Sequence, residues 1–324
     1  MPSSLRLRLI ATAAALPLLV PAAPGAQTTE RQVYVTVLDN RDGTPVSGLT
    51  TEHFAVREGG RDRDVLRVET LDTPMHVAVV LDTSFNAVLP IDSFRTAVGD
   101  FVERLAAVHH VALYTVAERP ARVLEFTRDT TKLRAAVAGL FARPESRAYL
   151  IDTIDLVLGD LRRLEPARPV VVAFTTESVE ASNLTAAAVM KQLIARGTSL
   201  HAVAFSNAVA VTGGAISRDA GNTSVPGRSQ MLGRLNAEGE GDRERNRLLT
   251  QGTTLTAGSV QRIVSVTALS APLHKLASEF AYSYRLTFAG PAPDKPLKDL
   301  QIGLLVEGVT VRAIAAPHTA GQVR

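Results

Sequence analysis

The chain has 324 residues, enough for roughly two domains, and its hydrophobic fraction of 46% is that of an ordinary globular protein with a sizeable core. Basic and acidic residues nearly balance at 35 against 32, and leaving out Arg6 and Arg8 near the start gives 33 against 32. This balance gives no support to nucleic-acid binding. The absence of cysteine excludes disulfides and a lipid-modified cysteine.

Residues 1–26 have the pattern of a secretory signal peptide. Arg6 and Arg8 form a basic start, Leu9 to Val20 is apolar, and small residues close the segment. The apolar stretch is short for a bilayer span of roughly 20 residues, and Pro17 interrupts it. A non-cleaved membrane anchor is the alternative. We expect an exported protein, periplasmic or extracellular, with no membrane span in its mature form.

Alternating apolar and polar residues between 31 and 70 predict antiparallel strands, with Asp42-Gly43 as a turn. A segment of this size is too small to bury a core alone. Residues 282–316 alternate in the same way and include an expected closing hairpin around Glu307-Gly308. We therefore expect 31–70 and 282–316 to pair in one small β-sandwich.

Strands and helices alternate between residues 74 and 206. Apolar runs predict buried strands, and periodic apolar residues predict helices. The expected strands are 76–82, 110–116, 122–126, 169–174 and 200–205, and the expected helices are 91–107, 132–141, 150–164 and 185–196. This alternation predicts an α/β fold, a doubly wound and mostly parallel sheet with helices on both faces.

The chain changes character after residue 206. Residues 207–261 are rich in Gly, Ser, Thr, Asn and charged residues, which predicts a flexible or irregular segment with at most a short helix near 244–249. A final helix is expected within 262–281. The predicted organisation is thus an α/β domain, at 74–206, inserted between two strand-rich segments.

The most informative residues follow the first buried strand of the middle region, as Asp82-Thr83-Ser84-Phe85-Asn86. Ligands in open α/β sheets bind just past the carboxyl ends of such strands. Asp82 and Ser84 are two residues apart, so both oxygens can reach one point above the sheet, which suits a hard cation. The segment resembles the first loop, Asp-x-Ser-x-Ser, of the von Willebrand factor A domain and its metal-ion-dependent adhesion site.

The resemblance extends over most of the chain after the predicted signal peptide. A group of bacterial exported proteins related to von Willebrand A domains carries a strand-rich segment before the domain. After the domain it carries a Gly-Thr-x-x-Thr-Gly-Gly stretch, a helix and a Tyr-Arg strand. Here the matching pieces are Gly252-Thr253-Thr254-Leu255-Thr256-Ala257-Gly258 and Tyr284-Arg285. The resemblance implies the same fold and a binding function.

The resemblance also implies a degenerate metal site. In the first loop Asn86 replaces the last serine, and its amide oxygen can still bind a hard cation. In the second loop Ala148 stands at the threonine position, with Ser146 two residues away. In the third loop Thr176 stands at the aspartate position, and Glu177 follows one residue late.

We therefore predict a weak Mg²⁺ or Mn²⁺ site. Its metal ligands are Asp82, Ser84 and Asn86, and the further candidate ligands are Thr176, Glu177 and Ser146. In the alternative, no metal binds, Asp82 only caps the next helix, and the Arg147 guanidinium pairs with Asp82 directly.

The predicted function is that of an exported, non-catalytic binding or adhesion module, for which the sequence names no protein partner. The loops 82–90, 143–150 and 175–184 form the expected contact face. Two alternatives stay open. Asp82 could be the nucleophile of a haloacid-dehalogenase-like or other hydrolase, although Ser84 stands where such enzymes place a second carboxylate. The chain could also be a metal-free assembly or scaffold protein of the cell envelope.

Overall fold

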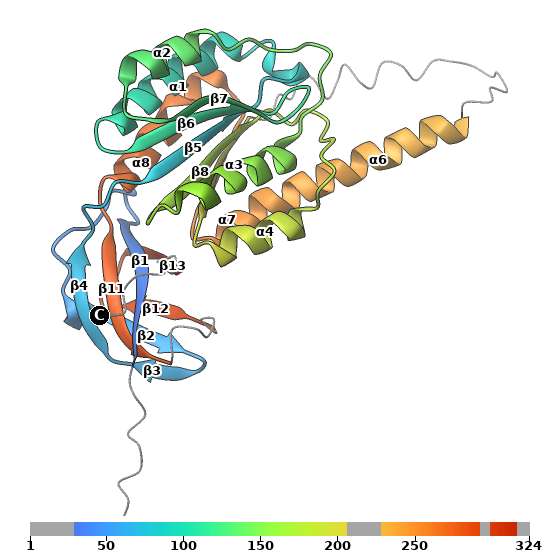
Figure 1. The fold of residues 1–324 in the computed structure, drawn as a ribbon. Helices are drawn as coiled ribbons and strands as arrows, with labels where there is room; N and C mark the ends of the chain where they lie inside the picture. The colour runs from blue at the N-terminus through green and yellow to red at the C-terminus, as the bar shows by residue number, and fades with distance from the viewer. Residues whose placement is uncertain (1–28, 206–227, 292–298, 316–324) are drawn as a thin grey trace, which may run out of the picture.

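The structure is a computed structural model that describes residues 29–205, 228–291 and 299–315. The predicted signal peptide and the start of the predicted irregular segment lie outside the described residues. An α/β unit of residues 76–280 stands on a strand unit built from residues 29–70 and 284–315 (Figure 1). Within the described residues, no helix is both long and apolar enough to cross a membrane.

A six-stranded sheet in the order β10-β9-β8-β5-β6-β7 forms the centre of the α/β unit. Its strands pair in parallel except for β7, which runs antiparallel to β6 at one edge. The strands are β5 (His76–Leu81), β6 (His110–Thr115), β7 (Ala121–Thr127), β8 (Pro169–Thr175), β9 (Ser199–Phe205) and β10 (Val260–Ile263). The predicted doubly wound α/β fold is confirmed.

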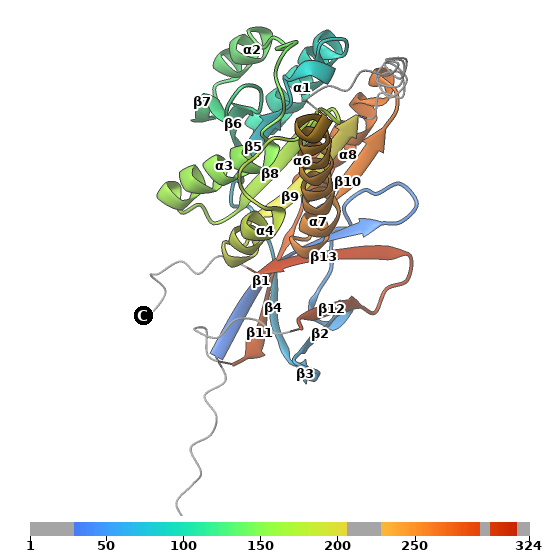
Figure 2. The ribbon, with the colours of Figure 1, turned by 90° about the vertical axis from the view of Figure 1, so that its right-hand side faces the viewer.

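Side chains of the central strands alternate between two hydrophobic cores, one on each face of the sheet. In β5, Val77 and Val79 belong to one core, while Ala78 and Val80 belong to the other. Such a strand is apolar at every position because neither face meets water. Helices α1 (Ile91–Ala106), α2 (Thr130–Ala138) and α8 (Ser270–Phe280) cover the first face, and α3 (Leu150–Leu164) and α4 (Ala186–Ala195) cover the second (Figure 2).

The strand unit consists of two antiparallel sheets that share one hydrophobic cluster. The four-stranded sheet has the order β13-β1-β11-β4, and the three-stranded sheet has the order β12-β2-β3. The strands are β1 (Thr29–Asp39), β2 (Phe54–Glu58), β3 (Arg61–Arg63), β4 (Val65–Thr70), β11 (Tyr284–Gly290), β12 (Gln301–Leu304) and β13 (Val309–Ala315). Strands from both ends of the chain therefore complete each sheet, with Val35, Phe54 and Leu286 in the shared cluster.

The expected closing hairpin around Glu307-Gly308 is wrong. β12 pairs with β2 in one sheet, whereas β13 pairs with β1 in the other. Both segments alternate apolar and polar residues, and alternation alone does not say which strand is the partner. The turn at Gly308 therefore carries the chain from one sheet to the other.

The irregular segment predicted at 207–261 is wrong over much of its length. Helix α6 (Arg228–Arg247) continues into a π-helical turn (Leu248–Gly252) and α7 (Thr253–Leu255), and β10 follows. The sequence of α6 lacks an apolar stripe, because the helix projects beyond the sheet (Figure 1). Leu248 and Leu249 anchor its end in the second core.

The Gly252-to-Gly258 stretch contains α7 and leads into β10. Thr256 Oγ1 donates to the Gly252 carbonyl at 2.7 Å and accepts from the Leu200 amide at 3.0 Å. A Cβ atom on Gly258 would lie 1.8 Å from the Leu200 carbonyl oxygen. Glycine is therefore required where this turn approaches β9, and the motif has a structural role.

We expect Gly258→Ala to lower the free energy of unfolding by about 1–3 kcal/mol, because the added methyl group must displace backbone. Gly159→Ala in α3 is the matched control, since nothing lies within 4 Å of its added Cβ atom. That change should be neutral or stabilising by up to about 1 kcal/mol. Denaturant unfolding of both variants measures the difference, and equal stabilities would contradict the steric role of Gly258.

Candidate functional site

The Asp82 carboxylate lies at the carboxyl end of β5, only 1% exposed. Ser84 donates to Asp82 Oδ1 from its amide, at 3.0 Å, and from its hydroxyl. Thr176 donates to Asp82 Oδ2 from its amide, at 2.9 Å, and from its hydroxyl, at 2.7 Å. Each carboxylate oxygen thus accepts two hydrogen bonds, and the first and third loops are tied together through this one side chain.

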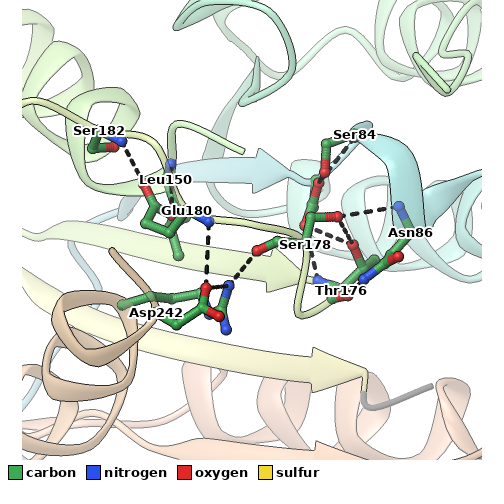
Figure 3. A network of polar contacts seen from close by, with 10 residues as sticks. Ser84, Asn86, Leu150, Thr176, Ser178, Glu180, Ser182 and Asp242 are labelled. Atoms are coloured by element: carbon green, nitrogen blue, oxygen red, sulfur yellow. Dashed lines mark hydrogen bonds and ion pairs between the residues drawn. The ribbon is translucent and has the colours of Figure 1, made fainter. Parts of the chain in front are cut away.

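Asn86 and Ser178 extend this network (Figure 3). The Asn86 side chain donates from Nδ2 to the Thr176 carbonyl at 3.0 Å, and the Asn86 backbone amide donates to Ser178 Oγ at 3.1 Å. Ser178 Oγ also lies 3.1 Å from Thr176 Oγ1. The structure therefore brings together four of the predicted site residues, Asp82, Ser84, Asn86 and Thr176. Ser178 was missed, although its position two residues after Thr176 repeats the spacing of Asp82 and Ser84.

The second loop contacts the first through its backbone, but the Ser146 side chain does not bond to Asp82. The Phe85 amide donates to the Ser146 carbonyl at 3.1 Å. The Ser146 hydroxyl, however, accepts from the Glu118 amide and donates to the Arg147 carbonyl. Ala148 is fully buried, and its backbone bonds to the third loop. The Ser146 hydroxyl thus bonds to the backbone of Glu118 and Arg147 rather than to Asp82.

Arg147 does not pair with Asp82. Its Nη2 atom lies 2.8 Å from Glu238 Oε1 on α6, so the expected direct ion pair between Arg147 and Asp82 is wrong. The physical reason is that Glu238 of α6 lies within reach of Arg147 at the protein surface, where both side chains remain partly exposed to water. Glu177 is exposed and lies at a positive φ of 50°, so the third loop turns it outward, away from the buried network.

Helix α6 contacts the third loop through a side chain that bonds to the loop backbone (Figure 3). The Arg245 guanidinium pairs with Asp242 at 2.9 Å and donates to the Ser178 carbonyl. Glu180 is buried, and it accepts from the Leu150 and Ser182 amides at 3.3 and 3.1 Å. Burial raises the pKa of Glu180 to about 7, and its hydrogen bonds and Arg245 oppose that rise.

The donor set fits a closed hydrogen-bond network better than a divalent-cation site. A Mg²⁺ site keeps one or two carboxylates with free lone pairs. Here Asp82 is the one carboxylate of the network, and four hydrogen bonds occupy its oxygens. Among the residues that the structure describes, no group of three or more His, Asp and Glu side chains is placed to hold a metal ion.

Large apolar side chains stand exposed on the loops above this network. On the first loop Phe85 is 60% exposed and Leu89 is 81% exposed, with Val88 beside them. Phe141, just before the second loop, is also exposed, and the Arg143 guanidinium lies 4.1 Å from its ring centroid. The second loop carries an open groove of about 500 Å³, lined by residues 143–147 with Glu118 and Tyr149.

No family model matches the chain, and no curated protein matches it. Solved structures do resemble it in fold. The conserved hypothetical protein BatB from Bacteroides thetaiotaomicron is 15% identical, over 63% of this chain and 98% of that chain, with a TM-score of 0.44. A von Willebrand factor type A protein from Catenulispora acidiphila is 10% identical, over 90% of this chain and 75% of that chain, with a TM-score of 0.43.

The α/β unit of this chain has helices on both faces of a mostly parallel sheet. Proximal thread matrix protein 1 from the mussel byssus, whose metal-ion-dependent adhesion site is occupied by zinc, is 14% identical with a TM-score of 0.44. That match covers 69% of this chain and 50% of that chain. The zinc belongs to that protein, and likeness at this level concerns the fold alone.

We expect Asp82→Ala to lower the free energy of unfolding by about 2–4 kcal/mol, because it leaves buried amide and hydroxyl donors without an acceptor. Asp82→Asn keeps the size and one acceptor oxygen, so it should cost less. Denaturant unfolding of the two variants gives the comparison. An Asp82→Ala protein as stable as the parent would show that the carboxylate does not join the loops.

A second carboxylate beside Asp82 should create a strong cation site. In Thr176→Asp two buried carboxylates would face each other, so Mg²⁺ or Mn²⁺ should raise the unfolding temperature of this variant by at least several degrees. Thr176→Asn, which has the same shape without the charge, is the control. Calorimetry and thermal unfolding with each metal should show no response in the parent or in Thr176→Asn. A response in the parent that Asp82→Ala abolishes would instead establish the predicted native site.

Proposed function

We propose that this chain is an exported binding module that docks a protein partner on a contact face formed by the loops 82–90, 143–150 and 175–184. The observation that carries the proposal is the group of exposed apolar side chains on the first loop, Phe85, Val88 and Leu89. The Phe85 amide donates to the Ser146 carbonyl, and Ser146 lines the open groove of the second loop. Exposed apolar side chains grouped beside polar ones are typical of interaction sites.

The energetics favour docking through these side chains. Full burial of one large apolar side chain stabilises a complex by about 1.5–3 kcal/mol before the costs of association. The groove beside them offers Arg143 and Arg147 as well as Glu118 and Glu145, so a partner with charges of both signs can pair along its rim. The exposed apolar residues would then form the centre of the interface and the groove its polar border.

The buried network beneath the contact face supports docking without a metal ion. Asp82 joins the first loop to the third, and α6 holds the third loop through Arg245. Loops fixed in this way lose little conformational freedom when a partner binds, which favours affinity. In this proposal the polar network preorganises the face, and the cation site predicted from Asp82, Ser84 and Asn86 stays a prediction.

The same geometry argues against the hydrolase alternative. A nucleophilic aspartate needs an oxygen that substrate can reach, with a general acid nearby. Both Asp82 oxygens point into hydrogen bonds, and the residue is 1% exposed. We therefore propose a non-catalytic role. The predicted signal peptide would place this role in the periplasm or outside the cell.

Site-specific photo-crosslinking in the cells that make this protein tests the proposal. A photoreactive residue at position 89 should give one discrete crosslinked protein, because Leu89 stands at the centre of the proposed contact face. The control position is 305, where Leu305 is 74% exposed on the strand unit. Phe85→Ser should reduce the position-89 adduct at least tenfold, since it removes a neighbouring apolar contact. Equal adducts from positions 89 and 305 would contradict the proposed face.

A further inference from the structure

A second buried polar group lies at the opposite edge of the sheet, where the α/β unit meets the strand unit. Two chain segments cross this junction, residues 71–75 and residues 281–283. Arg168, just before β8, touches both. Its Nη1 atom donates to the Thr73 carbonyl at 2.8 Å, and its Nη2 atom donates to Ser283 Oγ at 2.9 Å.

Arg168 is a buried cation without an anionic partner among the described residues. It is 6% exposed, and the two groups that accept from it are neutral. Burial lowers its pKa to about 10, so the side chain stays charged at neutral pH. A buried charge without a counter-charge is costly, and such charges in proteins are usually paired.

A cavity of about 50 Å³ adjoins Arg168 at this junction. Arg312 of β13 and Glu279 of α8 also line it, and these two form an ion pair across the junction. His201 lines it as well, and burial together with Arg312 lowers its pKa to about 3, so the imidazole is neutral at pH 7. The charged groups that line the cavity therefore sum to one positive charge.

We propose that this junction cavity binds one small monovalent anion of chloride size, held by Arg168 and neighbouring hydroxyl groups. The hydroxyls of Tyr34 and Ser283 line the cavity and can donate to the anion. A water molecule needs about 10–15 Å³ of such space, so the volume is ample for a chloride ion. A single negative charge would neutralise the excess and give Arg168 the counter-ion that the chain does not supply.

This assignment is independent of the contact face and of any partner. The bound anion would hold the two crossing segments together through Arg168, so it would stabilise the junction between the two units. A cation is disfavoured because Arg168 and Arg312 outnumber Glu279. A dianion such as sulfate would exceed the single positive charge of the lining.

Thermal unfolding at constant ionic strength tests the proposal. Replacing sodium gluconate by sodium chloride should raise the unfolding temperature of the parent protein by roughly 2–4 °C. Arg168→Met should abolish this response. The matched control is Arg262→Met, which removes an exposed arginine of β10 and should keep it. General salt effects act alike on both variants. An equal response in the two variants, or no response in the parent, would overturn the proposal.

Crystals of the parent protein soaked in bromide give a direct readout that does not depend on the folding of any variant. Bromide replaces chloride in such sites and is located by its anomalous scattering. A peak in the cavity within hydrogen-bonding distance of the Arg168 guanidinium would support the proposal. Peaks confined to surface arginines, with water in the cavity, would overturn it.

Discussion

The arrangement of the loops depends on one buried carboxylate. Asp82 is out of water, and a charge in that position is tolerated only if its oxygens are fully hydrogen-bonded. Ser84 satisfies one oxygen from within the first loop, and Thr176 satisfies the other from the third. The demand of one side chain for four donors thus fixes two loops against each other at the carboxyl edge of the sheet.

The hydroxyl of Thr176 occupies the place that a second carboxylate takes in the adhesion site that the sequence resembles. A hydroxyl there donates a hydrogen bond to Asp82, whereas a carboxylate would repel it and require a cation between them. With threonine at this position, the structure shows a hydrogen-bonded polar network around Asp82. In the proposed function, the exposed apolar residues of the first loop make the contact, since the buried polar groups face one another.

The two ends of the sheet therefore handle buried charge in different ways. At the carboxyl edge the chain supplies every partner of Asp82, and helix α6 adds Arg245 and Asp242 to hold the third loop. At the other edge Arg168 spans the junction with neutral partners and a cavity beside it. The first arrangement makes a surface rigid, and the second leaves room for an ion from solution.

The sequence by itself determined the α/β core, because a strand buried on both faces is mostly apolar and a helix packed on the sheet repeats its apolar residues every three to four positions. The pattern around Asp82 also placed the site at a strand end. The sequence did not reveal α6, which lacks an apolar stripe and is followed by Leu248 and Leu249 in the second core. Only the tertiary structure decided that β12 and β13 join different sheets. It also decided that the Ser146 hydroxyl bonds to the backbone of Glu118 and Arg147, and that Arg147 pairs with Glu238. Each of these depends on which distant backbone or carboxylate comes within about 3 Å, and local periodicity carries no information about such distances.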